Sequence, residues 1–266
     1  MDRAVFAITG PEAAPFLQNL LTHDLDRLAG QPAIYAGLLT PQGKIAFDFL
    51  LWRTEGGVLV DVHAGATEAL RKRLTLFKLR AKVEIGAIQP VGVFHAGSAH
   101  AGFVADPRNI ALGYRLIAPA ETPAPIAEPE AYKALRIAVG VPDPVYDAPN
   151  EEAFALEALF EELDGVDFKK GCFVGQENVS RMKRRATTRK KFCPVTFEGD
   201  APPFGAIVRA GAAELGSIRS AMPDRALAFL RLDRAREALA KGETIEAEGR
   251  PLRLDPPAWL IQPAGE

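Results

Sequence analysis

The chain has 266 residues, of which 48% are hydrophobic and 25% are charged, and its formal net charge is −2. These proportions are ordinary for a globular protein, and the length allows two or three lobes. The near-neutral charge argues against a general binder of polyanions. No apolar run reaches the roughly 18 to 20 residues that a membrane helix needs, and two cysteines do not make a disulfide framework. We therefore expect a cytoplasmic protein without a membrane span.

The first half of the chain alternates between strand and helix patterns, which predicts an α+β arrangement of antiparallel sheet and helices. Helical spacing of apolar residues marks residues 11–21 and 66–78. Strand patterns mark residues 33–39, 44–53, 58–63, 83–88, 91–95 and 115–117.

The second half of the chain has a different pattern of apolar residues. Apolar periodicity first predicts helices over residues 132–139 and 151–163. Short apolar runs broken by Gly and Pro then predict a small β-barrel, interrupted by one helical piece over residues 233–241. We therefore predict two domains, an α+β body of two intertwined lobes at residues 1–188 and a barrel at residues 189–266.

The most informative string surrounds one cysteine and is Lys-Lys-Gly-Cys-Phe-Val-Gly-Gln-Glu, residues 169–177. A thiol acts as a nucleophile or metal ligand only as the thiolate, which nearby Lys and Arg stabilise. Lys170 closely precedes Cys172, and Arg181 follows in a segment that is predicted to be a short helix. The glycines on either side of the cysteine lack Cβ, so the backbone can turn tightly and be approached closely. The alternative is that Cys172 is a small buried hydrophobic residue.

This string resembles the signature of the YgfZ-type folate-binding proteins, Lys-Gly-Cys-Phe-x-Gly-Gln-Glu. These proteins are relatives of the glycine-cleavage T protein and are implicated in maturing iron–sulfur proteins. Further segments resemble landmarks of the same family and occur in the right order, at residues 16–24, 33–45, 77–83 and 106–108. The similarity covers most of residues 1–190.

The resemblance implies a fold and a function. The fold would be T-protein-like, with antiparallel sheets and helices around a central folate cavity, followed by a C-terminal β-barrel. The protein would assist the assembly or repair of iron–sulfur clusters in client enzymes, tRNA-modifying ones among them. Its cofactor would be tetrahydrofolate or a derivative.

The resemblance also gives roles to the cysteine string. Cys172 would be the reactive thiol, either a transient ligand to a shared cluster or a redox partner. Two cysteines cannot hold a cluster alone, because a cluster normally has four protein ligands, so we expect no metal site of the chain's own. Lys170 and Arg181 would lower the pKa of the thiol. The other motif residues would shape the loop and the start of the following helix: Gly171, Phe173, Gly175, Gln176 and Glu177.

Three residues are expected to contact the folate: Tyr35, Asp48 and Arg115. When Tyr35 is aligned with a T-protein tyrosine, Asp48 falls on the aspartate that serves aminomethyl transfer, where a carboxylate could bind the pterin or act as a base. The alternative for Asp48 is an outward-facing strand residue. Arg115 replaces a pterin-binding acid and cannot act as a base, which puts aminomethyl transfer in doubt. Its guanidinium could still pair with a folate carboxylate.

A basic run leaves further alternatives open, since seven of the eleven residues from 181 to 191 are Lys or Arg. Such a run is most often a solvated face, but it could dock a folate tail or contact nucleic acid. The run has no aromatic residue for base stacking, which weakens the alternative of an RNA-associated factor. A folate-dependent aminomethyltransferase is the enzyme alternative. The expected partners are a folate and iron–sulfur assembly or client proteins, with neither membrane nor nucleic acid.

Overall fold

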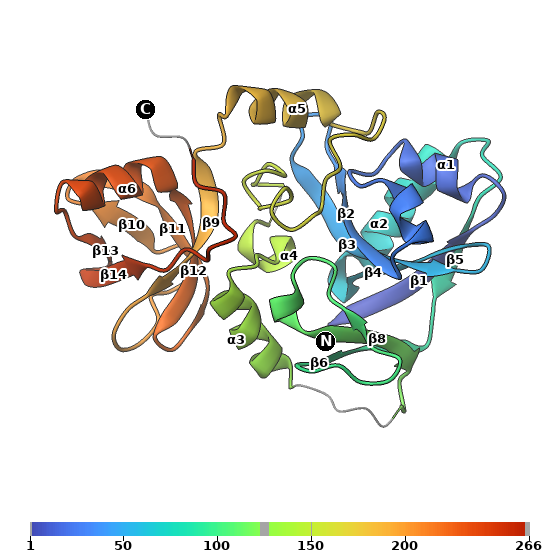
Figure 1. The fold of residues 1–266 in the computed structure, drawn as a ribbon, viewed down its shortest axis with the longest axis horizontal. Helices are drawn as coiled ribbons and strands as arrows, with labels where there is room; N and C mark the ends of the chain where they lie inside the picture. Colours follow the sequence, from blue (N-terminus) through green and yellow to red (C-terminus); the bar gives the residue numbers. More distant parts are fainter. Residues whose placement is uncertain (1, 123–127, 150, 264–266) are drawn as a thin grey trace. The chain divides into compact units, whose positions relative to one another are not determined.

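The computed structural model describes residues 2–122, 128–149 and 151–263 (Figure 1). The chain forms two compact units, each built from two segments: Met1–Tyr132 with Leu163–Gln176, and Lys133–Glu162 with Glu177–Glu266. The predicted α+β class is confirmed, with antiparallel sheets, helices and a closed barrel. No helix in the described ranges is long and apolar enough to cross a membrane.

The first unit is built on a five-stranded antiparallel sheet in the order β2-β3-β4-β1-β5. Its strands are β1 (Arg3–Thr9), β2 (Ala33–Leu39), β3 (Ile45–Thr54), β4 (Gly57–His63) and β5 (Glu84–Ile88). Helices α1 (Ala13–Gln18) and α2 (Thr67–Lys78) belong to the same unit, with short 3₁₀ turns η1 (Leu25–Ala29) and η2 (Ala64–Ala66).

The two faces of this sheet differ because side chains alternate along each strand. Phe49 and Leu51 of β3 belong to the hydrophobic core that Leu17 of α1 and Leu74 of α2 share. Asp48 immediately precedes Phe49 in β3, so its side chain belongs to the opposite face of the sheet. That second face therefore carries polar groups, and it positions the candidate site.

A three-stranded sheet in the order β6-β8-β7 completes the first unit. Its strands are β6 (Val91–Ala96), β7 (Val104–Ala105) and β8 (Tyr114–Pro119), with the 3₁₀ turn η3 (Ile110–Leu112) before β8. Arg115 lies on the central strand β8, in register with His95 of β6 and Val104 of β7.

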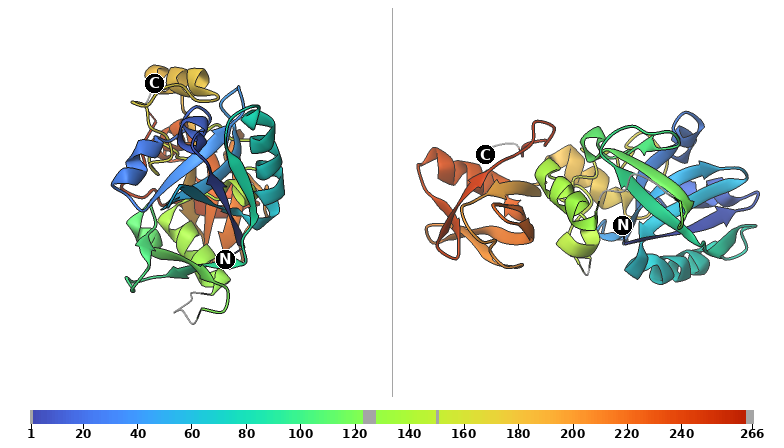
Figure 2. Two further views of the ribbon diagram at one scale, coloured as in Figure 1. Left: turned by 90° about the vertical axis from the view of Figure 1, so that its right-hand side faces the viewer. Right: turned by 90° about the horizontal axis from the view of Figure 1, so that it is seen from below.

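The second unit contains the predicted barrel (Figure 2). The barrel closes in the strand order β10-β11-β12-β9-β14-β13. Its strands are β9 (Lys190–Thr196), β10 (Ile207–Ala210), β11 (Ala213–Met222), β12 (Arg225–Arg231), β13 (Ile245–Ala247) and β14 (Arg250–Leu254). The remaining helices are α3 (Pro129–Val139), α4 (Pro144–Asp147), α5 (Gln176–Arg185) and α6 (Leu232–Ala240).

The helix expected over residues 151–163 is wrong. That segment is a succession of turns, and its residues Glu151 and Leu159 have positive φ angles of 55° and 65°. A residue with positive φ interrupts a right-handed helix. Leu159 and Phe160 are nevertheless fully buried, so the apolar pattern that suggested a helix reflects burial of irregular backbone.

Candidate functional site

The two cysteines lie in opposite environments. Cys172 is exposed, whereas Cys193 of β9 is buried. Burial, aided by the charge of Asp255, raises the pKa of Cys193 to about 12, so this thiol stays protonated at neutral pH. The alternative that Cys172 is a buried hydrophobic residue is therefore excluded.

Lys170 fixes the loop just before the exposed thiol. Its side chain is only 7% exposed, and its ammonium donates to the carbonyl oxygens of Gln18 at 2.7 Å, Leu21 at 2.6 Å and His23 at 3.0 Å. An ammonium has three protons to donate, so all of them are used. Lys170 thus joins the cysteine string to the loop that follows α1.

A second set of hydrogen bonds joins the same two segments. The Thr22 hydroxyl donates to the Gly165 carbonyl at 2.6 Å and accepts from the Gly37 amide at 2.8 Å. The Asp167 amide donates to the Thr22 carbonyl at 3.0 Å, while the Asp167 carboxylate accepts from the Lys169 amide at 2.7 Å. The segment at residues 16–24 and the cysteine string resemble separate family landmarks, and these hydrogen bonds hold the first segment to the residues that lead into the string.

The loop is also held after the thiol. Phe173 is buried, at 7% exposure. Gly175 has a φ of +81°, and a Cβ on it would lie 2.6 Å from the Thr40 carbonyl in the β2–β3 turn, so only glycine fits there. The Gln176 side chain donates to the Gly171 carbonyl at 3.2 Å. Cys172 consequently projects from a loop that is anchored on both sides.

The cations expected to act on the thiol have other partners. The Lys170 ammonium has no proton left for a thiolate, as described above. Arg181 is exposed on α5 and donates to the side-chain oxygen of Asn178. Glu177 is exposed in the first turn of α5. The roles expected for Lys170 and Arg181 at the thiol stay predictions.

Tyr35 and Asp48 lie together on the polar face of the five-stranded sheet. The Tyr35 hydroxyl donates to Oδ2 of Asp48 at 3.2 Å, and the Arg108 guanidinium lies 5.7 Å from the centre of the Tyr35 ring. Asp48 is only 7% exposed, so the alternative of an outward-facing residue is wrong. A buried carboxylate with a tyrosine partner is a suitable acceptor for ligand N–H groups.

Arg115 is held inside a network of charged groups. Its guanidinium donates to Asp106 at 2.6 Å, to the Tyr132 hydroxyl at 2.7 Å and to Asp61 at 3.4 Å. Arg108 completes the network by binding both carboxylate oxygens of Asp106, at 2.9 and 2.7 Å, and donating to Tyr132 at 2.7 Å. These contacts satisfy Arg115, which is 2% exposed, so the expected pairing with a folate carboxylate would require the network to open.

The network keeps Asp106 ionised. Burial alone would raise the pKa of Asp106, but the charges and hydrogen bonds of Arg108 and Arg115 outweigh that effect and hold the pKa well below its usual value. This carboxylate therefore serves as a fixed negative charge between two buried arginines.

Four residues of this region were absent from the predicted site: Asp61, Asp106, Arg108 and Tyr132. The Asp-Pro-Arg segment had been noticed only as a family landmark. Its two charged residues, bracketing a proline, were the available signal. Nothing local to Tyr132 indicates that it would accept hydrogen bonds from two arginines.

Two lysines of the basic run at residues 181–191 form ion pairs within the second unit. Lys183 contacts Glu161, and Lys191 contacts Glu162. These ion pairs join the run to the acidic turn segment upstream. Within the described ranges, no group of three or more His, Cys, Asp or Glu side chains could hold a metal ion.

The fold is that of the glycine-cleavage T protein. The crystal structure of the glycine cleavage system aminomethyltransferase T from Bartonella henselae superposes with a TM-score of 0.72, covering 98% of this chain and 85% of that one at 14% identity. Residues 189–262 match the model of the CAF17 C-terminal β-barrel domain.

Proteins of similar sequence identify the family to which the chain belongs within this fold. The human mitochondrial iron–sulfur cluster assembly factor IBA57 is 31% identical over 86% of this chain and 75% of its own length. The Neurospora crassa homologue of that factor is 26% identical, over 97% of this chain and 65% of its own length. The chain belongs to the IBA57 family of iron–sulfur cluster assembly factors. The narrower resemblance to YgfZ-type proteins stays a prediction.

The expected cytoplasmic location is contradicted by these relatives. The human, Neurospora and mouse proteins are all named as mitochondrial. Composition and cysteine usage distinguish reducing from oxidising surroundings, and they do not identify a compartment.

Proposed function

We propose that this protein assists the assembly or repair of iron–sulfur clusters and that Cys172 supplies one thiolate ligand to a cluster shared with a partner protein. Family membership supports the general role. The observation that carries the specific one is the exposed thiol on a loop anchored on both sides, since a ligand that hands a cluster on must be accessible and held in position. The remaining ligands would come from the partner.

The loop explains why the neighbouring motif residues accompany the cysteine. Lys170 fixes the loop before the thiol, and Gly175 with Gln176 fixes it afterwards, as described above. Gly171 has no atom within 4 Å of a Cβ placed on it, so the backbone beside the sulfur is open to an approaching protein. The loop thereby presents one thiol without enclosing it.

A tetrahydrofolate-type ligand would be held at Tyr35 and Asp48. These residues fit such a ligand, because a pterin ring presents N–H groups from which a buried carboxylate can accept hydrogen bonds. Asp48 would accept from the pterin, and Tyr35 would orient the carboxylate. A folate bound there would supply a one-carbon carrier; this chain's own contribution is binding and orientation.

The cluster role is tested by Cys172→Ser in cells whose only copy of the gene carries the variant. We expect the activity of iron–sulfur enzymes to fall while the amount of folded protein is unchanged. Cys193→Ala is the matched control, since it removes the other thiol from the barrel, and it should retain the activity. Wild-type enzyme activities in the Cys172→Ser cells would contradict the proposal.

The folate role is tested separately by titration calorimetry with tetrahydrofolate. Asp48→Asn should weaken binding by roughly tenfold or more, the cost of losing a hydrogen bond to a charged group. Asp200→Asn, at an exposed carboxylate, is the control. Equal affinity in the two variants would remove Asp48 from the binding site without touching the role of Cys172.

A further inference from the structure

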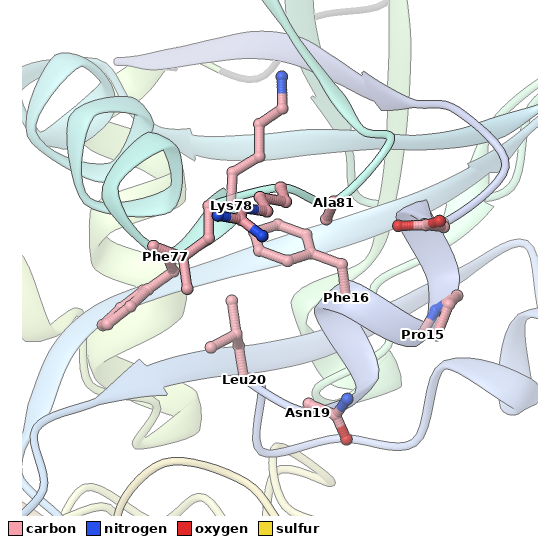
Figure 3. Close-up of a pocket in the computed structure, with 10 residues that line it drawn as sticks. Pro15, Phe16, Asn19, Leu20, Phe77, Lys78 and Ala81 are labelled. Atoms are coloured by element: carbon pink, nitrogen blue, oxygen red, sulfur yellow. The ribbon is translucent and has the colours of Figure 1, made fainter.

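The first unit has an apolar hollow between α1 and the end of α2 (Figure 3). Its volume is about 460 Å³, and Phe16 and Leu20 of the α1 region line it together with Phe77 and Leu79. Phe77 and Leu79 are 37% and 88% exposed. The hollow is concave and apolar, as sites for protruding side chains of a binding partner are.

Leu79 occupies an unfavourable position for a leucine. It ends α2 with φ 47° and ψ −109°, a conformation in which a side chain with a Cβ is strained and glycine is favoured. Its side chain is also almost wholly exposed to solvent. The fold therefore keeps a strained, solvated leucine at the edge of the hollow, where strain is a known mark of binding sites.

The rim of the hollow is positively charged. Lys78 and Arg80 line it, and Lys82 follows two residues later. The one carboxylate in the lining, Glu12, accepts a hydrogen bond from the Lys82 backbone amide at 2.9 Å. The apolar floor is thus bordered by cations, a pattern complementary to apolar side chains flanked by carboxylates.

We propose that this hollow docks a short acidic, amphipathic segment of a partner protein. Apolar side chains of the segment would enter between Phe16 and Phe77 and cover Leu79, while its carboxylates would face Lys78 and Arg80. An anionic membrane fits less well, because membrane-binding faces insert protruding apolar side chains and do not enclose a hollow. The proposal is independent of the proposed function, since the surface shares no residue with the cysteine loop.

The probe is a phage-displayed library of short peptides, selected on the full chain and counter-selected on Leu79→Asp. We expect the enriched peptides to carry apolar residues flanked by Asp and Glu. Against these peptides, Leu79→Ala should lose roughly tenfold in affinity, as a residue that the bound partner covers does. Lys78→Glu with Arg80→Glu should lose at least as much, and the affinity of the wild type should fall with salt.

Three controls separate docking from folding and from the thiol. Leu239→Ala replaces a leucine of α6 that is 44% exposed and should leave the affinity unchanged. Cys172→Ser should bind as the wild type does. Leu79→Gly should lose binding without lowering the urea midpoint of unfolding, because glycine relieves the positive φ.

Several results would overturn the proposal. One is the absence of enrichment over the Leu79→Asp counter-selection, and another is enrichment of peptides without acids. A lower unfolding midpoint for Leu79→Gly would make Leu79 a folding residue. Binding to phosphatidylserine vesicles in place of peptides, or a dimer that Leu79→Ala dissociates, would assign the surface to a membrane or to a second copy.

Discussion

The ammonium of Lys170 donates to the carbonyl oxygen of Leu21 at 2.6 Å, across a sequence separation of 149 residues. Lys170, which directly precedes the Gly171-Cys172 pair in the sequence, is a buried link between two segments of the first unit. Burial lowers its pKa to about 8, against the opposing charges of Asp24 and Asp167.

Replacing this link should destabilise the protein. Lys170→Met keeps the length of the side chain but leaves three buried carbonyls without their donor, so we expect a loss of about 2 to 3 kcal/mol in the free energy of unfolding. Urea denaturation measures it. The adjacent Lys169 is exposed, and Lys169→Met should change stability by less than about 0.5 kcal/mol. Equal effects of the two substitutions would contradict the anchoring role.

The two glycines that flank Cys172 should respond differently to alanine. Gly175→Ala combines a positive φ with a contact of 2.6 Å to the Thr40 carbonyl, so we expect a loss of about 2 kcal/mol or more. Gly171→Ala places its methyl group in open space and should cost little. Thermal unfolding of both variants tests the difference, and a stable Gly175→Ala protein would show that the loop is held by other contacts.

The thiols should be distinguishable by reagent accessibility. In the native protein, a disulfide reagent such as DTNB should label one thiol rapidly, because Cys172 is exposed and Cys193 is buried with a raised pKa. In urea it should label two. The Cys172→Ser protein should release no rapid colour before unfolding. Fast labelling of that variant would mean that the barrel opens readily or that Cys193 is accessible.

Arg115 offers a test between structural and ligand-binding roles. Arg115→Lys keeps the charge but has a single nitrogen in place of the three that contact Asp106, Asp61 and the Tyr132 hydroxyl. Breaking a buried ion-pair network costs about 3 to 5 kcal/mol, so we expect a markedly lower unfolding free energy by urea denaturation. A variant of wild-type stability that binds tetrahydrofolate less tightly would restore the expected pairing of Arg115 with the ligand.

Local patterns predicted much of this fold, and long-range contacts account for what they missed. The β2–β3 hairpin and the barrel follow from alternation and turn residues, which are properties of neighbours in the chain. The helix over residues 151–163 failed because apolar spacing does not report the positive φ of Leu159. The apolar residues of that segment are buried in irregular backbone, so the same sequence pattern arises without a helix.

The candidate site shows the same division. The motifs suggested an accessible thiol at Cys172 and a site shared by Tyr35 and Asp48. In the structure Cys172 is exposed, and Tyr35 is hydrogen-bonded to Asp48. The partners of Arg115 could not be inferred, because Asp61 and Tyr132 are 54 and 17 residues away. A sequence gives the charge of a residue, and only the fold decides which opposite charge it meets.

That charge network should make stability depend on pH in the acid range. The folded protein holds the pKa of Asp106 well below the ordinary value of 3.8, so the unfolded chain binds a proton at Asp106 that the folded protein does not. The stabilisation is therefore fully present above that ordinary value and is lost as the pH falls below it. For this group alone we expect a loss of about 1 kcal/mol by pH 3.

Urea denaturation at pH 5, 4 and 3 measures how steeply the free energy of unfolding depends on pH, with Asp106→Asn as the comparison. The variant should be less stable at pH 5, and its stability should fall less steeply toward pH 3. Parallel slopes would mean that Asp106 is already protonated in the folded protein, and the two arginines would then lack the charge that holds them inside.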